Sequence, residues 1–283
     1  MVVKIVTDSS ADLPARFIQE LGITVVPLYV RFGEQVYRDR VDITEDEFYQ
    51  RLIKDTVHPS TTQPSPQDFA TVYKNLAKEA DGIVSLHISA KLSGTCNSAL
   101  QAKNEVKECP IEVIDSQILT MALGLVVISA AKLANTGAKF EDVVSHVRKV
   151  LPTIKLLGLL DTLKFLLLGG RIGKAKALLG SLLNVKPVLT LKDGEVVPAG
   201  QVRSRSKGMD RLFEFVKTGN RIEELSVIHN TTPEEAETLA NRIVNANIIS
   251  REKLIISRVG PMLGVHMGPG ALIVTYKESE PSD

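Results

Sequence analysis

The residues Ile83 to Ala99, IVSLHISAKLSGTCNSA, begin as an apolar β-like run, break at a turn of small residues and resume as a helical pattern. In an open α/β sheet, ligands bind beyond the carboxyl ends of the strands, where helix N-termini present unpaired N–H groups. Ser93, Gly94 and Thr95 occupy this turn and offer hydroxyls and backbone donors to a polar or anionic ligand. The alternative is a Ser/Thr cap of the following helix, with a glycine for close packing.

The first half of the chain alternates such apolar runs with helical patterns. We predict strands over Val2–Val6, Ile23–Phe32 and Ile111–Ile114, with a long apolar helix after the last of these that ends at Gly137. Strands that alternate with helices at this spacing indicate a parallel sheet with both faces covered.

The second half has a different rhythm, which begins after Pro152. Asp193-Gly194 joins two β runs, Pro187–Leu191 and Val196–Val202, and an Asp-Gly between β runs is the strongest short-range hairpin signal. We therefore predict an α/β protein of two domains. A parallel α/β/α domain spans residues 1–152, and a mixed-sheet α/β domain spans residues 153–283.

Helix boundaries can also be predicted locally. Capping-box patterns begin at Thr44, Ser65 and Thr232, and a further helix is expected over Lys174–Leu183. Asp8 follows the first strand within a cluster of hydroxyls, where it is either a site residue or an ordinary cap for the helix that starts near Pro14.

Charge and composition exclude several classes of partner. The 283 residues include 34 basic and 33 acidic ones, and this net charge of +1 gives no long-range field to hold nucleic acid or a membrane surface. The apolar run Met121–Ala131 is too short to span a bilayer and Leu156–Leu168 contains charges, so both are assigned to the core and no stable membrane insertion is expected. Two cysteines, Cys96 and Cys109, and no signal-peptide pattern before the first strand indicate a reduced, cytoplasmic protein.

Familiar cofactor motifs fail. Gly169–Lys174 resembles a phosphate-binding loop, but its glycine spacing is one residue short, and Ala175 stands where a metal-binding hydroxyl is needed. No G-x-G-x-x-G follows a strand, and the five histidines lack metal-ligand spacing. We expect no metal and no cofactor.

Polar loops remain as site candidates. The prolines around Thr61-Thr62-Gln63 stiffen that segment and hold its hydroxyls out rather than in a ladder, and Ser65 caps the helix that follows. The Ser93 turn is the second loop, and His266, in a glycine-proline turn, is the third; alone, each could be an ordinary surface turn.

Several motifs together resemble the DegV family, the fatty-acid-binding proteins that serve bacterial fatty acid kinase. They occur in the family's order over nearly the whole chain: DSSADLP, Thr-Thr-Gln-Pro-Ser, Leu-Ser-Gly-Thr, Gly-Gly-Arg-Ile, Arg-Ser-Arg-Ser-Lys and His-Met-Gly-Pro-Gly-Ala. The resemblance implies a parallel α/β/α domain followed by a mixed-sheet domain, with a long-chain fatty acid in an apolar tunnel and its carboxylate at the domain junction.

The resemblance also assigns roles to residues. Thr61 and Ser93 would hydrogen-bond the carboxylate, with Thr62 and Gly94 in the same loops and His266 close by. The protein would have no catalytic residue of its own and would present the acid to a separate, ATP-dependent fatty acid kinase, which forms an acyl-phosphate. From their expected surface positions, and not from the resemblance, we further predict that Arg171, Arg203 and Arg205 face that kinase or the new phosphate, whose geometry a guanidinium matches; the alternative is that they are solvated surface charges.

A rival hypothesis is a serine hydrolase of lipid esters. Ser93 would be its nucleophile, His266 the base, and Asp8 or Asp115 the orienting acid. Ser93 lacks the G-x-S-x-G elbow that exposes such a nucleophile, so the sequence favours the carrier.

Overall fold

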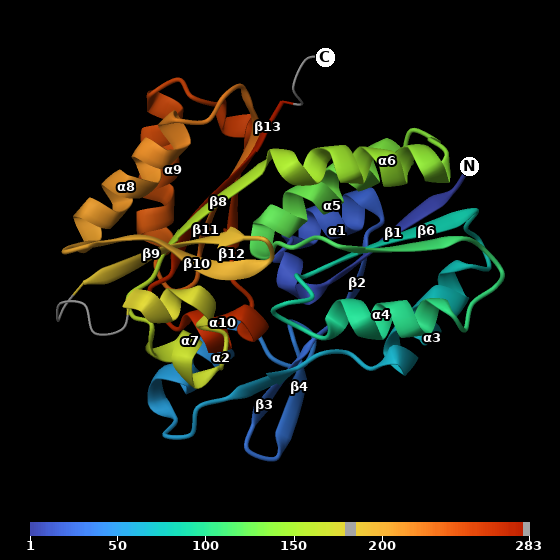
Figure 1. Cartoon of the computed structure of the whole chain (residues 1–283), viewed down its shortest axis with the longest axis horizontal. Helices are drawn as coiled ribbons and strands as arrows, with labels where there is room; N and C mark the ends of the chain where they lie inside the picture. The colour runs from blue at the N-terminus through green and yellow to red at the C-terminus, as the bar shows by residue number, and fades with distance from the viewer. Residues whose placement is uncertain (179–184, 280–283) are drawn as a thin grey trace.

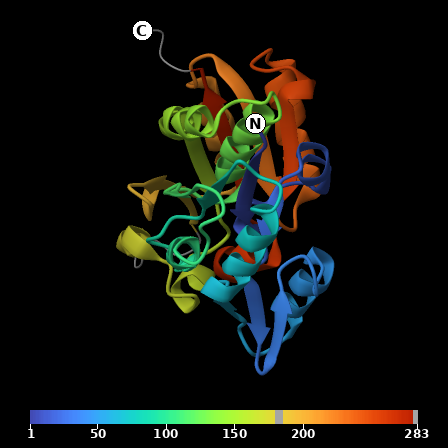
Figure 2. The same ribbon diagram turned by 90° about the vertical axis from the view of Figure 1, so that its right-hand side faces the viewer.

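The computed structural model describes residues 1–178 and 185–279. Within these residues the strands form two large sheets and one small sheet (Figure 1). The small sheet, in the order β4-β3-β5, projects away from the two large ones, as a view from the side also shows (Figure 2).

The first large sheet has four parallel strands in the order β2-β1-β6-β7, as predicted for the first half. Its strands are β1 (Val3–Asp8), β2 (Thr24–Val26), β6 (Gly82–His87) and β7 (Ile111–Asp115). The helices α1 (Ala15–Leu21), α5 (Thr120–Ala134) and α6 (Phe140–Val150) cover one face, and α3 (Pro66–Leu76) and α4 (Thr95–Lys103) cover the other (Figure 1). Every residue of β6 is buried, which explains its mostly apolar sequence.

The prediction of one strand over residues 23–32 is wrong. The segment forms β2 and β3 (Tyr29–Phe32), which belong to different sheets, with Pro27 between them. Proline has no N–H for a ladder, so the chain leaves the parallel sheet there. β3 then pairs with β4 (Gln35–Arg38) and with β5 (Ser60–Thr62). Thr61 and Thr62 therefore lie in a short strand, which corrects the expectation of a loop outside any ladder.

The second large sheet has six strands in the order β10-β9-β8-β13-β11-β12 and is mixed, because only β11 and β12 run parallel. Its strands are β8 (Ile154–Leu159), β9 (Lys186–Lys192), β10 (Glu195–Val202), β11 (Ile222–His229), β12 (Leu254–Arg258) and β13 (Leu272–Glu278). The predicted hairpin is confirmed: β9 and β10 are antiparallel, and both turn residues, Asp193 and Gly194, have positive φ. The helices α8 (Arg205–Lys217) and α9 (Pro233–Asn245) pack on this sheet.

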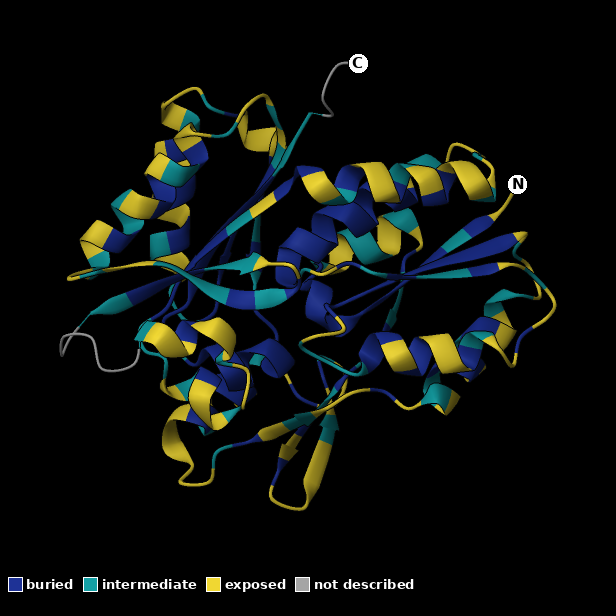
Figure 3. Ribbon diagram, in the orientation of Figure 1, coloured by how far each residue is buried: buried dark blue, intermediate teal, exposed yellow. Residues whose placement is uncertain are grey.

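Helix α5 lies between the two large sheets. It contacts β1 and β6 of the first sheet and β8, β11 and β13 of the second. All of its residues except Lys132 and Leu133 are buried, and Figure 3 shows it almost wholly in the colour of buried residues. A helix that is apolar on all sides fits such a position. The first sheet ends at Asp115 and the second begins at Ile154, which is consistent with two domains; the boundary near Pro152 stays a prediction.

Several helix predictions need correction. Ser65 does form a full capping box and Thr44 caps α2 (Glu45–Lys54), but Thr232 makes no side-chain cap bond to α9. His266 lies in the last turn of a helix, α10 (Pro261–Met267), rather than in an open turn. The helix predicted over 174–183 is a 3-10 helix, η3 (Gly173–Leu178), and the rest of that prediction lies outside the described residues.

The remaining short helices connect these elements. They are η1 (Ser9–Ala11), η2 (Leu151–Thr153), α7 (Lys164–Leu168) and η4 (Arg251–Lys253). Among the described residues, no helix combines the length and the apolar character needed to cross a bilayer.

Candidate functional site

An apolar cavity with an empty volume of about 870 Å³, its mouth included, lies where elements of both halves of the chain meet. Leucines from the first half, such as Leu28 and Leu119, face leucines of β8 and β9 in the second half, such as Leu156 and Leu189. Its other apolar lining residues are Ile88, Leu92, Leu160, Leu166, Leu191, Val196, Met262, Leu263, Met267 and Ile273. The cavity thus offers an apolar surface that belongs to neither sheet alone.

The predicted polar segments meet at this same cavity. Thr61, Thr62, Ser93, Arg171 and His266 all contribute to its lining, together with Gln63. Gly94 lies in an adjoining polar pocket that shares Ser93 and Arg171 with the cavity. A Cβ atom at Gly94 would lie 2.9 Å from Gln63 Nε2, so the absent side chain lets the two loops approach. β5, the turn before α4 (Ser93) and α10 therefore bring hydroxyls and an imidazole to one apolar space.

Thr61 and His266 are joined directly. Thr61 Oγ1 lies 2.9 Å from His266 Nε2, although the residues are 205 positions apart in the chain. His266 is buried, and burial, with smaller effects from Arg171 and His58, lowers its pKa from 6.5 to about 4. The imidazole is therefore neutral near pH 7, and hydrogen bonding decides which nitrogen carries its proton.

The tautomer of His266 determines what Thr61 can offer. A threonine hydroxyl has one proton. If His266 Nε2–H donates to Thr61 Oγ1, Thr61 keeps its own proton for a ligand in the cavity. In the opposite arrangement, Thr61 would donate its proton to His266 Nε2 and would have none left for a ligand. The imidazole proton would then be on Nδ1, which is buried and has no hydrogen-bond partner among the described residues. The Nε2–H tautomer therefore suits a site that binds an acceptor.

Because Gly169 has no side chain, the His266 imidazole can pack directly against its backbone. A Cβ atom at this glycine would lie 2.1 Å from His266 Nδ1, which no real contact allows. Gly170, the next residue, has a φ of +67°, which favours glycine. The glycine-rich turn that fails as a phosphate loop thus serves to pack the imidazole against the cavity.

Ser93 lies just before α4 and contacts Thr95. The two hydroxyl oxygens are 2.8 Å apart, and the Thr95 N–H donates to Ser93 Oγ at 3.3 Å. This second contact resembles the helix cap considered as the simpler alternative, although the N-cap position itself is Gly94. Because Ser93 also lines the cavity, its hydroxyl can serve both the helix end and a ligand.

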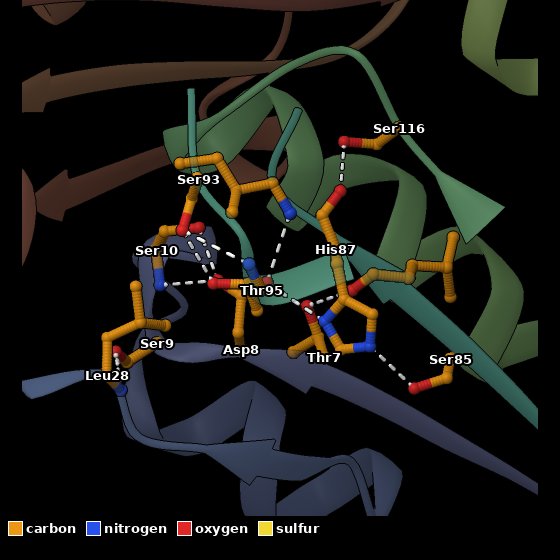
Figure 4. A network of polar contacts seen from close by, with 12 residues as sticks. Thr7, Asp8, Ser9, Ser10, Leu28, Ser85, His87, Ser93, Thr95 and Ser116 are labelled. Atoms are coloured by element: carbon orange, nitrogen blue, oxygen red, sulfur yellow. Dashed lines mark hydrogen bonds and ion pairs between the residues drawn. The ribbon is translucent and has the colours of Figure 1, made fainter. Parts of the chain in front are cut away.

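Asp8 belongs to a buried network, which Figure 4 draws together with Ser93 and Thr95. One carboxylate oxygen accepts hydrogen bonds from the backbone and hydroxyl of Ser10, and the other accepts the Ile88 N–H and faces His87 Nδ1, both at 3.0 Å. His87 Nε2 continues to Ser85 Oγ at 2.7 Å. Asp8 and His87 are completely buried, so this network caps η1 and ties β1 to β6.

The hydrolase residues are not arranged as a triad. His266 Nε2 is occupied by Thr61, and Ser93 Oγ by Thr95. Of the two proposed acids, Asp8 orients His87, and Asp115 accepts backbone N–H groups at 3.0 Å. A nucleophile, a base and an orienting acid need consecutive hydrogen bonds, and the described contacts do not supply them.

The three arginines differ in environment. Arg171 is exposed and donates to the carbonyl oxygens of Leu92 and Gly169, at 3.2 and 2.9 Å, which holds it at the cavity mouth. Arg203 is exposed directly after β10. Arg205 corrects the expectation of a free surface arginine, because its guanidinium pairs with Glu235 at 2.5 Å and with Asp161 at 3.5 Å.

Neither a metal site nor a disulfide is present in the part of the chain that the structure describes. Its His, Cys, Asp and Glu side chains form no group of three able to hold a metal ion. Cys96 and Cys109 are both free.

Fold and site together define a class: an α/β protein with a parallel and a mixed sheet that enclose an apolar cavity with a polar end. The family model of DegV, described as a family of uncharacterised proteins, matches residues 2–278. The chain belongs to the DegV family.

Individual relatives match this chain over nearly the whole length of both proteins. A DegV domain-containing protein from Streptomyces coelicolor is 40% identical over 274 residues, which cover 95% of this chain and 96% of the relative. The structure of a fatty-acid-binding DegV family protein from Thermus thermophilus matches with a TM-score of 0.91 and 35% identity, covering 98% of this chain and 100% of that one. A stearic-acid-binding protein from Eubacterium ventriosum matches with a TM-score of 0.88 and 30% identity, covering 98% of each chain.

Proposed function

We propose that this protein binds a long-chain fatty acid in the cavity, with the carboxylate held by Thr61, Thr62, Ser93 and Gly94 and with His266 beside it, orienting the Thr61 hydroxyl. The observation that carries the proposal is that the predicted polar segments line the same leucine-rich cavity. The solved relatives that bind fatty acids, including stearic acid, support it.

The chemistry of both ends suits such a ligand. A carboxylate only accepts hydrogen bonds, and the hydroxyls of Thr61 and Ser93 can donate them. Burial of an acyl chain gains about 0.8 kcal/mol for each CH₂, so a chain of roughly 16 carbons gains on the order of 10 kcal/mol before the costs of ordering. The apolar wall would supply most of the affinity, and the polar end would fix the direction of the ligand.

Mass analysis of purified protein tests this proposal. Native mass spectrometry, with chloroform extraction of the same sample, should identify a bound acid of roughly C14 to C18, since a chain this long leaves water at a gain of about 0.8 kcal/mol per CH₂. Delipidated protein should bind added palmitate or oleate. Protein that is free of lipid as purified and has no affinity for either acid would show that the cavity serves another purpose.

We further propose that the protein is a carrier rather than an enzyme and presents the carboxylate to a separate fatty acid kinase, which uses ATP to form an acyl-phosphate. Arg171 supports this role, because it is exposed at the mouth of the cavity, beside Ser93, whose hydroxyl would donate to the ligand carboxylate. Arg203 is a second exposed guanidinium that a partner could contact. Arg205 is already paired within the protein, so we assign the partner-facing role to the other two.

Substitution of these arginines should separate binding from phosphorylation. Arg171→Ala and Arg203→Ala are expected to retain fatty acid in the extraction assay but to lose acyl-phosphate formation with the kinase and ATP, because Arg matches phosphate and carboxylate geometry. Arg16→Ala, at an exposed position on α1, is the matched control and should behave as wild type. If both Arg171→Ala and Arg203→Ala are purified without lipid, the arginines belong to the ligand site instead.

A further inference from the structure

Asp12, in the DSSADLP motif, is a second buried carboxylate with no part in the fatty acid site itself. It is 1% exposed. One of its oxygens accepts the Gly260 N–H at 2.8 Å and the Arg40 guanidinium at 3.2 Å, and the other accepts the Thr120 hydroxyl at 2.6 Å. Asp12 therefore joins three segments that are far apart in the sequence.

The backbone around this carboxylate is strained. Asp12, Arg40 and Thr120 have φ values of 51°, 61° and 51°, in the left-handed region that residues other than glycine rarely adopt. Threonine is β-branched, so this conformation is costly for it in particular. Such strain persists only where surrounding contacts impose it, and here all three residues meet in one set of hydrogen bonds.

The contacts of this cluster hold the segment that leads into α10. Gly260 is the N-cap of that helix. Ser257 donates to the Asp12 carbonyl oxygen, and Arg40 donates to the Arg258 carbonyl oxygen, both at 2.5 Å. The Tyr49 hydroxyl donates to the Val259 carbonyl oxygen at 3.1 Å. Residues 257–260 are thus fixed from the first half of the chain.

Helix α10 connects this anchor with the candidate site. All seven of its residues are buried, and His266 lies in its last turn. A short, fully packed helix moves as a unit, so the position of its N-terminus determines where His266 Nε2 stands relative to Thr61.

We infer that Asp12 is a positioning residue of the site: it fixes the N-terminus of α10 and thereby holds His266 against Thr61. Its effect on ligand affinity rests on the proposed function, whereas its effect on His266 does not. Its side-chain hydrogen-bond partners in the described part of the chain, Arg40, Thr120 and Gly260, do not line the cavity.

The charges around Asp12 decide the conditions of a test. Arg40 and Asp39 follow β4, Glu45 comes from α2, and Arg40 also pairs with Glu45 at 3.1 Å. Burial raises the pKa of Asp12 to about 6, against the opposing effect of Arg40. Burial also raises the pKa of Asp39 to about 7, although the nearby Arg40 guanidinium again opposes this rise. Measurements at pH 8 therefore compare a charged Asp12 with its neutral replacement.

Asp12→Asn is the first variant, and the ¹⁵N and ¹H NMR signals of the His266 imidazole are the first readout. We expect these signals to shift or broaden, and the dissociation constant of palmitate to rise about tenfold, since a displaced His266 no longer orients the Thr61 hydroxyl. Asp142→Asn, at an exposed position in the first turn of α6, is the matched control and should leave both measurements unchanged.

Gly260→Ala provides an independent variant that changes no charge. Its added Cβ atom would lie 2.9 Å from Arg40 Nε and would push the anchor apart, although the backbone of Gly260 suits alanine. The same shift of the His266 signals is expected. Unchanged His266 signals in either variant, once circular dichroism shows it folded, would overturn the inference. A wild type that binds no palmitate would refute the proposed function alone, because the NMR comparison stands without a ligand.

Discussion

Replacing Gly158 by phenylalanine is expected to abolish measurable binding of palmitate while the protein stays folded. Gly158 lies in β8 and lines the cavity. A Cβ atom there would meet only Ile273 Cγ1 at 3.4 Å and the Leu189 carbonyl oxygen at 3.9 Å, both ordinary contacts. The first atom of a new side chain is therefore accommodated, and the ring that follows must occupy space that the acyl chain would use.

The expected size of this effect follows from the length of chain that is displaced. Exclusion of about six methylenes from the cavity loses about 5 kcal/mol at 0.8 kcal/mol for each CH₂, which corresponds to more than a thousandfold in affinity. Isothermal titration calorimetry with delipidated protein measures it directly. Gly158→Ala is the graded control and should weaken palmitate binding only modestly, with a shift in preference toward an acid about one or two carbons shorter. Unaltered palmitate affinity in folded Gly158→Phe would place the acyl chain elsewhere.

Much of the architecture could be predicted because local signals agreed with the tertiary structure. The run Ile83–Leu86 is buried on both sides, and Asp193-Gly194 provides the backbone that a tight hairpin needs. The errors arose where one residue changed the path of the chain. Pro27 divides a continuous β pattern into strands of two different sheets, and the strand that contains Thr61 exists only because β3 offers it a partner.

The polar end of the site could be located from the sequence, whereas its apolar wall could not. Thr61, Ser93 and His266 lie in polar motifs that the resemblance to the DegV family places around one carboxylate, although each alone could be an ordinary cap or turn. Leu156 and Leu189 have the same pattern whether they pack on each other or surround a ligand, and only the arrangement of the sheets distinguishes the two. The role of Asp12 is also invisible in the sequence, because its partners Arg40, Thr120 and Gly260 are distant from it along the chain.

The second large effect is expected from removing the Thr61 and Ser93 hydroxyls, which would donate hydrogen bonds to the ligand carboxylate. Thr61→Val keeps the shape of the side chain but removes its hydroxyl, and Ser93→Ala removes the other. A hydrogen bond to a charged group contributes about 1.5–3 kcal/mol, so each variant should weaken fatty acid binding about tenfold to a hundredfold. His266 cannot make up the loss with a charge, because its pKa of about 4 in the free protein leaves it neutral at pH 7.

Conservative variants and the double substitution test whether these hydroxyls act on the ligand. Thr61→Ser restores a hydroxyl and should regain most of the affinity, whereas Thr61→Val with Ser93→Ala should bind palmitate more weakly than either single variant. Hydrocarbon binding offers a second control, because hexadecane has no carboxylate and should enter the cavity of wild type and Thr61→Val equally well. If palmitate affinity stays the same in both single variants, the carboxylate does not contact these hydroxyls. If hexadecane binding falls together with palmitate binding, the hydroxyls maintain the shape of the cavity and do not hold the charge.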